Sequence, residues 1–474
     1  MRRVFAWLIL LAVGSAACMV GPDYRRPKVE VPATFRDAPP APPIPAPVMG
    51  DLAWWDLFAD PTLQALIRTA LEANYDLRIT VTRILQAQAQ VTIARSQIYP
   101  TVNAGIEAPY TRYTGGSKPP LTPKESFAPD GGVSVSWELD LWGRLRRATE
   151  AARAELLASE EARRAVVTTL IAQVAQTYFD LRSLDASLEI SRRTLTSRKQ
   201  SLALTRARLE GGVAQLLDVR QSEAMVADAA TTIPQFERQI TQTENALDTL
   251  LGRDPAPIPR GLPLLQQITL PAVPPGVPSD LLARRPDIRQ TEQQLIAANA
   301  QIGAAKALLF PTVMITGFAG AGGVVVSGQS FGPFGLYTAL PTITLPLFTM
   351  GRLQAGVEQA EAQTQEAVLR YQQTIQQAVR EVADALVEVR KRREARMEQD
   401  NLVAALADGS RVADMRYRGG VSSYLEVLDT DTRLFNAELQ LAQAQLDELA
   451  AWIQLYKALG GGWQTEEAAQ MPQG

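Results

Sequence analysis

The feature that most constrains this fold is a helical stretch without interruption from Gly143 to Leu209. After Gly143 it contains neither proline nor glycine, so nothing in about 67 residues stops a helix. At 1.5 Å per residue such a helix is roughly 100 Å long, which is far longer than a compact domain. A helix of this length needs other long helices packed along its side, as in a coiled coil.

A heptad repeat within the stretch supports this packing. The apolar positions that recur every seven residues are Val167, Val174, Leu181, Leu188, Leu195, Leu202 and Leu209. A repeat of seven places these side chains on one seam of the helix. We therefore expect this seam to pack against neighbouring helices.

The stretch also has a copy later in the chain. Residue numbers that differ by 208 relate Gly143-Arg144-Leu145 to Gly351-Arg352-Leu353, and Leu251-Gly252 to Leu459-Gly460. The heptad reappears in the copy and lapses at Arg396 and Ser410. The chain is therefore one structural half used twice.

These observations predict the following organisation. The segments are a signal peptide at 1–17, a lipid-anchored Pro-rich tether at 18–60, a first repeat at 61–252, a Pro-rich linker at 253–278, a second repeat at 279–462 and a polar tail at 463–474. We expect strands at about 101–141 and a long helix at 143–209 in the first repeat. The second repeat is predicted to have strands at about 312–349 and a long helix at 351–417.

Composition excludes several classes of function. The net charge is −3, there is no histidine, and Cys18 is the only cysteine. The basic residues are scattered, so no nucleic-acid partner is predicted. Histidine general bases, His/Cys metal sites and internal disulfides are excluded together. The pair Glu138 and Asp140 is interpreted as ordinary charge, so the sequence predicts no catalytic residue, no metal and no cofactor.

The N-terminus predicts export and lipidation. Arg2-Arg3 precede an apolar run from Val4 to Val13, and small residues lead to Cys18, as in a lipoprotein cleavage site. We expect diacylglyceryl and acyl groups on Cys18. Met19 rather than aspartate follows it, which in lipoproteins goes with the outer membrane. The alternative is an ordinary signal peptide with an incidental cysteine.

Before the long helix, the spacing of the apolar residues changes from a helical period to strict alternation. From Val133 to Leu141 apolar residues alternate with polar ones, and the polar residues are Ser134, Ser136, Glu138 and Asp140. Nine to eleven residues is the length of a tilted transmembrane strand, with one face to lipid and these four side chains to a wet lumen. A partner strand is expected from Val102 to Ala108. The alternative is a half-buried soluble hairpin.

The second copy predicts another hairpin, from Thr312 to Gly320 and from Tyr337 to Leu347, around a Gly-rich loop. Four strands cannot close a barrel, and an open edge in lipid leaves unpaired backbone groups. The chain is therefore expected to oligomerise. Two, three or four copies would give eight, twelve or sixteen strands, and the residues alone do not choose among them.

At the far end of the long helices, glycine-containing turns lead into return helices. The turns contain Gly212-Val213 in the first copy and Gly420-Val421-Ser422 in the second. Glycine at a helix end is ordinary capping. These two tips are nevertheless where a partner would meet the helical end.

Several ordered motifs along the chain resemble those of a known family. The motifs are Asp23-Tyr24-Arg25-Arg26-Pro27, Trp137-Glu138-Leu139-Asp140-Leu141-Trp142-Gly143-Arg144, Arg285-Pro286-Asp287-Ile288, Ala297-Ala298-Asn299-Ala300, Arg416-Tyr417-Arg418-Gly419-Gly420-Val421 and Leu455-Tyr456-Lys457-Ala458-Leu459-Gly460-Gly461-Gly462-Trp463. Together they resemble the outer-membrane factor lipoproteins of the TolC-like, NodT-type group, over essentially the whole chain.

The resemblance implies a mostly α fold with a transmembrane β-barrel portion: a homotrimer whose twelve-stranded barrel continues into a long periplasmic α-helical barrel. It also implies a passive exit duct for small toxic compounds, located in outer-membrane lipid. Its expected partners are a periplasmic adaptor protein at the tips and an inner-membrane transporter of the resistance-nodulation-division type. The alternatives are a duct for type I protein secretion, or an envelope enzyme or structural coiled-coil lipoprotein.

A periplasmic gate is expected where the two copies disagree. The second copy carries Asp408, Arg411 and Asp414 where the first has Gln200, Ala203 and Arg206. In a closed oligomer the carboxylates would form a ring of like charge that attracts cations. Alternatives are an ordinary solvated helix face, or a constriction at an apolar ring such as Val412.

Overall fold

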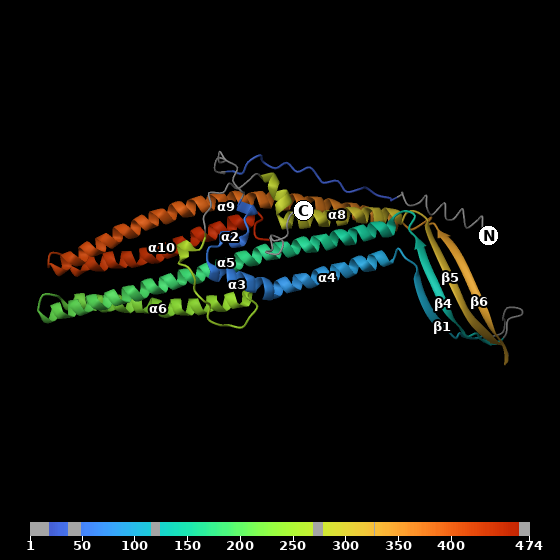
Figure 1. The fold of residues 1–474 in the computed structure, drawn as a ribbon, viewed down its shortest axis with the longest axis horizontal. Coiled ribbons are helices and arrows are strands. Elements are labelled where there is room, and N and C mark those ends of the chain that lie inside the picture. The colour runs from blue at the N-terminus through green and yellow to red at the C-terminus, as the bar shows by residue number, and fades with distance from the viewer. Residues whose placement is uncertain (1–18, 37–48, 115–123, 269–277, 327, 464–474) are drawn as a thin grey trace. The chain divides into compact units, whose positions relative to one another are not determined.

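The computed structural model describes residues 19–36, 49–114, 124–268, 278–326 and 328–463 (Figure 1). Contacts divide the chain into two compact units, which are described separately. The strand unit comprises residues 1–29, 83–160 and 290–372, and the hairpin unit comprises 30–82, 161–289 and 373–474. Each unit therefore takes segments from both sequence repeats. Among the described residues, no helix combines the length and hydropathy needed to cross a membrane.

The strand unit contains one antiparallel sheet. Its strands are β1 (Thr101–Glu107), β2 (Tyr110–Arg112), β3 (Glu125–Phe127), β4 (Asp130–Leu139), β5 (Thr312–Val326) and β6 (Gln329–Thr344). β4 pairs with β1 on one side and with β5 on the other, and β6 pairs with β5. Figure 1 shows β1, β4, β5 and β6 side by side.

The short strands β2 and β3 continue the lines of β1 and β4. Pro109 separates β1 from β2, and Pro129 separates β3 from β4. Proline has no N–H and cannot donate to the ladder, so each line breaks there. The six strands therefore form four long lines, as two hairpins of the sequence predict.

The second hairpin is longer than the sequence predicts. Of the glycines in the expected Gly-rich loop, Gly322 and Gly323 lie within β5 and Gly332 and Gly335 within β6, and a β-bulge falls between Gly322 and Val324. Glycine is disfavoured in strands unless another backbone approaches closely. A Cβ on Gly322 would lie 3.2 Å from the carbonyl oxygen of Pro129, so the close approach of the neighbouring backbone favours glycine within this strand. The predicted loop is wrong for this reason.

Four helices enter the strand unit and continue into the hairpin unit. They are α4 (Tyr75–Ser96), α5 (Arg144–Glu210), α8 (Pro286–Ala307) and α9 (Arg352–Arg418). Within the strand unit α5 and α8 meet through a cluster of buried alanines: Ala151, Ala154, Ala297 and Ala300. Small side chains let the two helices approach closely.

The N-terminal segment from Met19 to Val29 has no helix or strand and is fixed to the strand unit. Val20 donates its N–H to the carbonyl of Trp142 at 3.1 Å. The Tyr24 hydroxyl donates to Glu292 Oε1 at 3.0 Å, and Arg26 forms an ion pair with the same carboxylate. The expected extended tether therefore has a defined path here.

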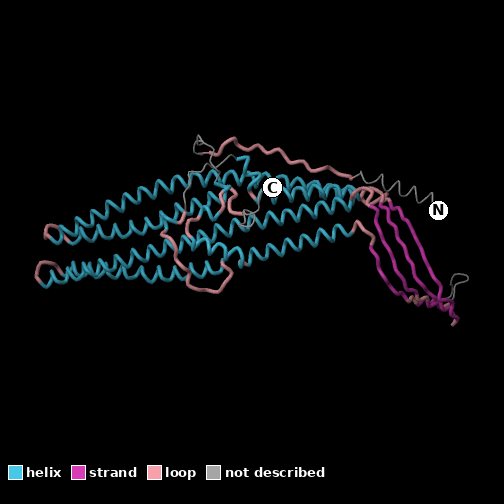
Figure 2. The backbone as a smooth tube through the Cα atoms, viewed as in Figure 1, coloured by secondary structure: helices cyan, strands magenta, loops and turns pink. Residues whose placement is uncertain are grey.

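The hairpin unit contains the rest of α5 and α9 and their return helices. The remaining helices are α2 (Trp54–Leu57), α3 (Pro61–Ala73), α6 (Leu216–Leu250), α7 (Leu281–Arg284) and α10 (Tyr424–Ala458), with 3-10 turns η2 (Met49–Asp51), η3 (Leu264–Gln266) and η4 (Pro278–Asp280). α5 turns into α6 and α9 turns into α10, which makes two long helical hairpins (Figure 2).

The predicted tether does not extend to residue 60. Met49, Trp54, Leu57 and Phe58 are almost fully buried, and Phe58 packs edge-on against Phe179 of α5. These side chains bury large apolar areas, which pins residues 49–60 into the core of the hairpin unit. Only the part of the segment before this point has tether composition.

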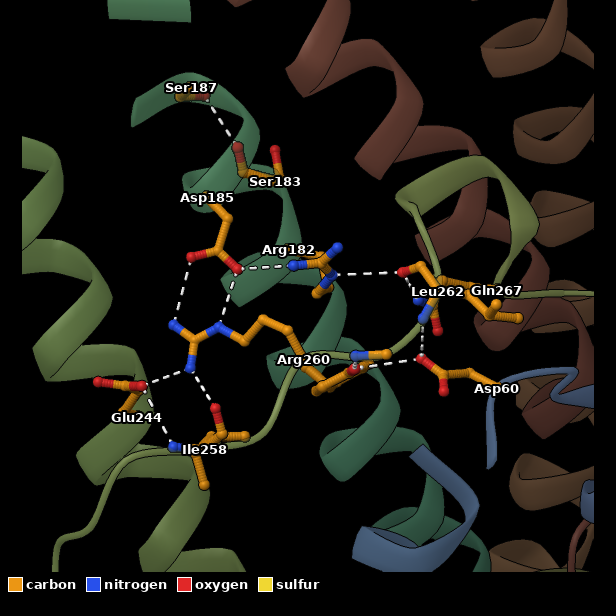
Figure 3. A network of polar contacts seen from close by, with 12 residues as sticks. Asp60, Arg182, Ser183, Asp185, Ser187, Glu244, Ile258, Arg260, Leu262 and Gln267 are labelled. Carbon is orange, nitrogen blue, oxygen red and sulfur yellow. Dashed lines mark hydrogen bonds and ion pairs between the residues drawn. The ribbon is translucent and has the colours of Figure 1, made fainter. Parts of the chain in front are cut away.

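The first part of the Pro-rich linker is also packed (Figure 3). The buried Asp60 carboxylate accepts from the backbone N–H of Leu262 at 3.0 Å and from the Tyr178 hydroxyl at 3.1 Å. Burial raises the pKa of Tyr178 to about 12, so the hydroxyl stays protonated and donates. Arg260 binds Asp185 and Glu244, which ties the linker to α5 and α6.

The heptad seam is buried in only part of α5. Val167, Val174 and Leu181 are fully buried, as expected. Beyond Leu181 the later leucines of the seam are half-buried, and different residues take the buried positions. The buried polar residues there are Ser183, Ser187, Ser191, Thr194, Arg198 and Thr205.

Candidate functional site

The sheet has two open edges. Among the described strands, β1 pairs only with β4, and β6 pairs only with β5. Every residue of β1 and of β6 is exposed, including apolar side chains such as Ile106, Tyr337 and Ile343. Unpaired edge groups invite pairing with another strand, and in hydrocarbon each costs several kcal/mol.

One face of the helical wall in the strand unit is polar but almost uncharged. Two adjoining cavities of about 380 and 570 Å³ lie on it, and they share Ala148, Gln301 and Gln363. Most of their lining is alanine and glutamine; the glutamines are Gln90, Gln97, Gln294, Gln301, Gln359 and Gln363. Such a face is wetted by water without holding ions tightly.

The charged groups on this face are Arg144 and Glu155. Burial raises the pKa of the Glu155 carboxyl. Arg144 forms an ion pair with Glu138 of β4 at 2.7 Å, so part of its charge is compensated. The face as a whole therefore carries little net charge.

The two hairpin tips expose apolar side chains. Gly212 and Gly420 have φ of 74° and 79°, which only glycine adopts without strain. Val213 and Val421 are exposed, whereas Ser422 is half-buried and its hydroxyl has no hydrogen-bond partner among the described groups. The positive φ explains these glycines without any need for a partner.

The tips also contain exposed residues that the sequence reasoning missed: Leu216, Leu217 and Leu425. They lie at the start of the return helices, where the apolar pattern resembles an ordinary helix beginning. The only feature of the sequence that could have indicated their exposure is their position next to the glycine turns. With the two valines they give each tip an apolar surface.

Within the chain the two tips are held together. The Arg208 guanidinium lies 4.5 Å from the centre of the Tyr417 ring and donates to its carbonyl oxygen at 2.9 Å. Tyr417 packs on Tyr424, with ring centres 5.3 Å apart, and Leu204 of α5 packs against this cluster. A cation over an aromatic face and shared apolar packing join α5 to the second hairpin.

The expected gate residues lie on an exposed part of α9. Asp408 and Arg411 pair with each other at 2.5 Å, while Asp414 pairs with Arg418 at 2.7 Å. Exposed pairs within one helix contribute only about 0.2–0.5 kcal/mol each. Both carboxylates are therefore easily released to other partners, and the acidic ring stays a prediction.

Comparison with known proteins identifies the chain. The model of the Outer membrane efflux protein family matches residues 66–253 and 277–461. The chain belongs to this family. It is 37% identical over 464 residues to the toluene efflux pump outer membrane protein TtgF of Pseudomonas putida, which covers 96% of both chains. It is 34% identical to the cation efflux system protein CusC of Escherichia coli, over 96% of this chain and 98% of the relative.

Solved structures have the same fold. A membrane protein from Pseudomonas aeruginosa is similar with a TM-score of 0.86 and 34% identity, covering 94% of this chain and 100% of that one. The open state of the MtrE outer membrane channel of Neisseria gonorrhoeae is similar with a TM-score of 0.85 and 34% identity, covering 94% and 99%. This outer membrane efflux protein is thus an outer-membrane channel component of an efflux system, and the resemblance seen in its motifs is confirmed.

One predicted lumen residue of the efflux protein is misplaced. β4 ends at Leu139, so Asp140 is outside the strand. Its carboxylate accepts from the backbone N–H groups of Leu145 at 3.1 Å and Arg146 at 3.0 Å. It therefore caps the first turn of α5, where free N–H groups and the helix dipole favour a negative charge.

The other three residues of that set remain in β4. Ser134 and Ser136 alternate with the more exposed Val133 and Val135, as a strand with two distinct faces requires. Glu138 is held by Arg144 and is not a free lumenal charge. The alternation from residue 133 to 139 correctly indicated a strand. The pattern extended by chance to Asp140, which belongs to the N-terminal cap of α5.

The expected lipidation residue, Cys18, lies outside the described residues. The first described residue, Met19, packs beside Gly143, where a Cβ would lie 2.9 Å from the Met19 side chain. The chain therefore enters the structure next to the start of α5. Lipidation stays a prediction.

Proposed function

We propose that this chain is the passive exit duct of a tripartite pump, and that three copies close into one conduit. In this proposal a periplasmic adaptor joins it to an inner-membrane transporter of the resistance-nodulation-division type. The duct has no catalytic role and uses no cofactor or metal. The observation that carries the proposal is the pair of open edges, β1 and β6, in a sheet too small to close on itself.

Edge pairing explains how the conduit closes. β6 of one copy would pair with β1 of the next, which satisfies both rows of free backbone groups. Three copies give twelve long lines of strand, the number implied by the resemblance to outer-membrane factors. The uncharged alanine and glutamine face would then line the lumen and let solutes pass without binding tightly.

The lumen favours small organic compounds as cargo. Relatives of this chain are named for the efflux of toluene and of cations. An almost uncharged lining offers little attraction to a cation, so organic solvents and amphiphilic toxic compounds are the better match. The proposed acidic ring at Asp408 and Asp414 would act farther along the conduit.

Edge pairing is tested by cysteine crosslinking, because Cys18 is the only native cysteine. In a Cys18→Ser background, a cysteine at Asn103 of β1 is combined in turn with cysteines on the same face of β6, at Leu336, Thr338 and Leu340. We expect a ladder of crosslinked species that ends at three copies. Asn103 combined with a cysteine at Thr316, on the same face of the interior strand β5, is the control and stays monomeric. A ladder ending at two or four copies would overturn the stoichiometry.

Transport is tested by deleting the gene and exposing cells to a panel of solvents, dyes, antibiotics and metal ions. Sensitivity to organic compounds that the wild-type gene restores supports the proposal. A defect confined to export of a protein would favour type I secretion instead. Unchanged tolerance across the panel would overturn the efflux role for this chain.

Docking at the tips is tested with Val213→Glu combined with Val421→Glu. Neither position has positive φ, so the turns stay intact while a charge enters the apolar tip. We expect normal oligomers in the membrane, lost adaptor crosslinking and lost efflux. Leu265→Glu, at an exposed site away from the tips, is the matched control. Adaptor crosslinking that survives the double change would place the docking site elsewhere.

The lipid anchor is tested by Cys18→Ser and labelled fatty acid. We expect the label to be lost while the closed barrel still inserts, because one or two acyl chains bind a membrane far less strongly than a spanning structure does. Label that persists in the variant would contradict acylation at this cysteine.

A further inference from the structure

A third cavity in the strand unit has a different chemistry from the uncharged face. It has a volume of about 670 Å³ and lies between α4, α5 and α8 beside Met19. On α5 it is lined by Thr149, Arg153 and Leu157, whereas the uncharged face uses Ala148 and Ala152. At about 100° per residue the centres of these sets lie about a third of a turn apart. The cavity therefore opens on a different side of the helical wall.

The cavity is basic. It is lined by three arginines, Arg95, Arg146 and Arg153. Arg146 is already bound to Asp140 at 3.2 Å. Arg95 and Arg153 have no carboxylate or other hydrogen-bond partner within the described part of the chain. Two guanidinium groups with free donors thus border one cavity.

The acidic group on the lining does not neutralise these two arginines. Glu150 borders the cavity, but its carboxylate accepts from the buried Arg147 at 2.9 Å. Arg147 also binds Asp23 of the N-terminal segment at 2.8 Å. The remaining charge of the cavity is therefore positive, which suits an anion with several acceptor oxygens.

The rest of the lining is apolar. Ile98, Leu157 and Ile296 border the cavity together with Met19. Leu157 and Met19 are among the exposed large apolar side chains. A free inorganic anion gains nothing from such side chains, whereas a hydrocarbon chain buries them at about 25 cal/mol per Å². The ligand that fits both parts is anionic at one end and apolar at the other.

The cavity also lies at the right level for a membrane lipid. Arg95 is in the last turn of α4, shortly before β1 begins at Thr101, and Arg146 is in the first turn of α5, shortly after β4 ends at Leu139. The headgroup region adds about 5–8 Å to each side of the hydrocarbon core. Arg95 reaches that layer directly. Arg153 lies nine residues beyond the start of α5, about 14 Å along the helix, and its long side chain extends back toward the strands because helical side chains tilt toward the N-terminus.

We propose that this cavity binds an anionic phospholipid of the periplasmic leaflet. Arg95 and Arg153 donate to its phosphate, and its acyl chains lie along Ile98, Leu157 and Ile296. The bound lipid would bridge α4, α5 and α8 next to the point where the N-terminal segment joins the unit. This inference uses the outer-membrane location of the family and does not depend on which solute the duct exports.

The test measures lipid retention by the full-length oligomer in lipid nanodiscs. The discs contain phosphatidylethanolamine with phosphatidylglycerol, and lipid that remains bound after detergent extraction is identified by native mass spectrometry. Arg95→Gln combined with Arg153→Gln is expected to lower phosphatidylglycerol retention about tenfold or more, because two charge-assisted contacts are lost. The matched control is Arg83→Gln. Arg83 is exposed, lies on α4 like Arg95, and has no partner in the described residues, so this variant is expected to keep wild-type retention.

A second variant separates a lipid from a free phosphate. Leu157→Gln keeps the arginines and is expected to weaken phosphatidylglycerol retention several-fold while leaving the binding of inorganic phosphate unchanged. An intact oligomer band for each variant shows that folding is preserved. Three results would overturn the proposal: equal retention in wild type and the double arginine variant, equal retention of phosphatidylethanolamine and phosphatidylglycerol, or displacement of the lipid by inorganic phosphate in Leu157→Gln and wild type alike.

Discussion

Arg198 is expected to be the strongest single polar tie among the helices of the hairpin unit. Its side chain is 3% exposed and extends from α5 toward α6 and α10. Nε donates to Asp431 of α10 at 2.9 Å, and Nη1 donates to Asp228 of α6 at 3.0 Å and to the carbonyl of Met225 at 2.9 Å. The guanidinium also lies 5.1 Å from the Phe435 ring centre.

The cost of removing this arginine follows from the exposure of its partners. Breaking a fully buried ion pair costs about 3–5 kcal/mol, because the remaining charge is stranded without solvent. Here the side chains of Asp431 and Asp228 are 24% and 62% exposed, so water reaches both carboxylates. The loss is then close to one or two charge-assisted hydrogen bonds, about 2 kcal/mol. Arg198→Met keeps the apolar stem, so packing losses are small.

Hydrogen exchange measured by mass spectrometry checks this value locally. Because about 1.4 kcal/mol is a factor of ten, amides of α6 and α10 around Asp228 and Asp431 should exchange roughly 30-fold faster in Arg198→Met. The matched control is Arg192→Met on the same helix, whose pair with Glu237 has side chains 59% and 50% exposed. An exposed pair contributes at most about 1 kcal/mol, so its exchange should change little. Equal effects of the two substitutions would refute the reasoning.

Three further predictions concern other parts of the chain. A Cβ at Gly261 would lie 2.1 Å from the Asp60 carboxylate, so Gly261→Ala should cost about 1–3 kcal/mol and lower the melting temperature measured by circular dichroism; an unchanged melting temperature would contradict the tight packing of the linker. Asp408→Ala with Asp414→Ala should raise single-channel conductance and lower cation preference in planar bilayers, and the acidic ring is wrong if matched changes in the first copy do the same. The buried Tyr417 hydroxyl has no partner among the described groups, so Tyr417→Phe should leave thermal stability unchanged or raise it by up to about 1 kcal/mol, and a marked loss would reveal a missing partner.

The long helices were predictable because their signals are local. Absence of glycine and proline after Gly143 is a property of the sequence alone, and α5 runs from Arg144 to Glu210 accordingly. The strand hairpins were predictable for the same reason, since alternation reports two distinct faces. Their lengths were not, because Gly322 and Gly323 signal a loop until the neighbouring backbone that packs against them is known.

Residues 49–60 and the Pro-rich linker show where local signals fail. Proline-rich composition describes what a segment can form alone. The prolines of the tether end at Pro47, and Trp54 and Phe58 after them acquire their role only from a core built by distant helices. Asp140 fails differently: it continues an alternating pattern by one more polar residue, yet the N–H groups that it caps belong to the next element. Tertiary partners, rather than propensity, decide such positions.

The heptad of α5 shows that periodicity predicts a packing seam without identifying its partner. In the part of α5 that follows Leu181, the polar positions buried within the chain are serines, threonines and Arg198. Leu188 and Leu195 of the heptad are only half-buried there. Apolar surface left partly open at regular spacing is expected where another copy packs. The leucine seam thus fits an interface between chains, and the polar seam fits contacts within one chain.

The polar seam, which consists of the buried serines and threonines of α5 beyond Leu181 together with Arg198, affects how easily the hairpins can move. The hydroxyls of Ser187 and Ser191 donate to carbonyls of their own helix, at 3.0 and 2.9 Å, and Thr205 does the same at 2.9 Å. These hydrogen bonds are not lost when neighbouring helices shift, so small buried side chains give a smooth surface with few bonds across it. The charged contacts of Arg198 do cross the seam and would have to break. An opening motion of the tips would therefore meet its main polar resistance at this arginine, and Arg198→Met should favour the open conduit as well as faster exchange.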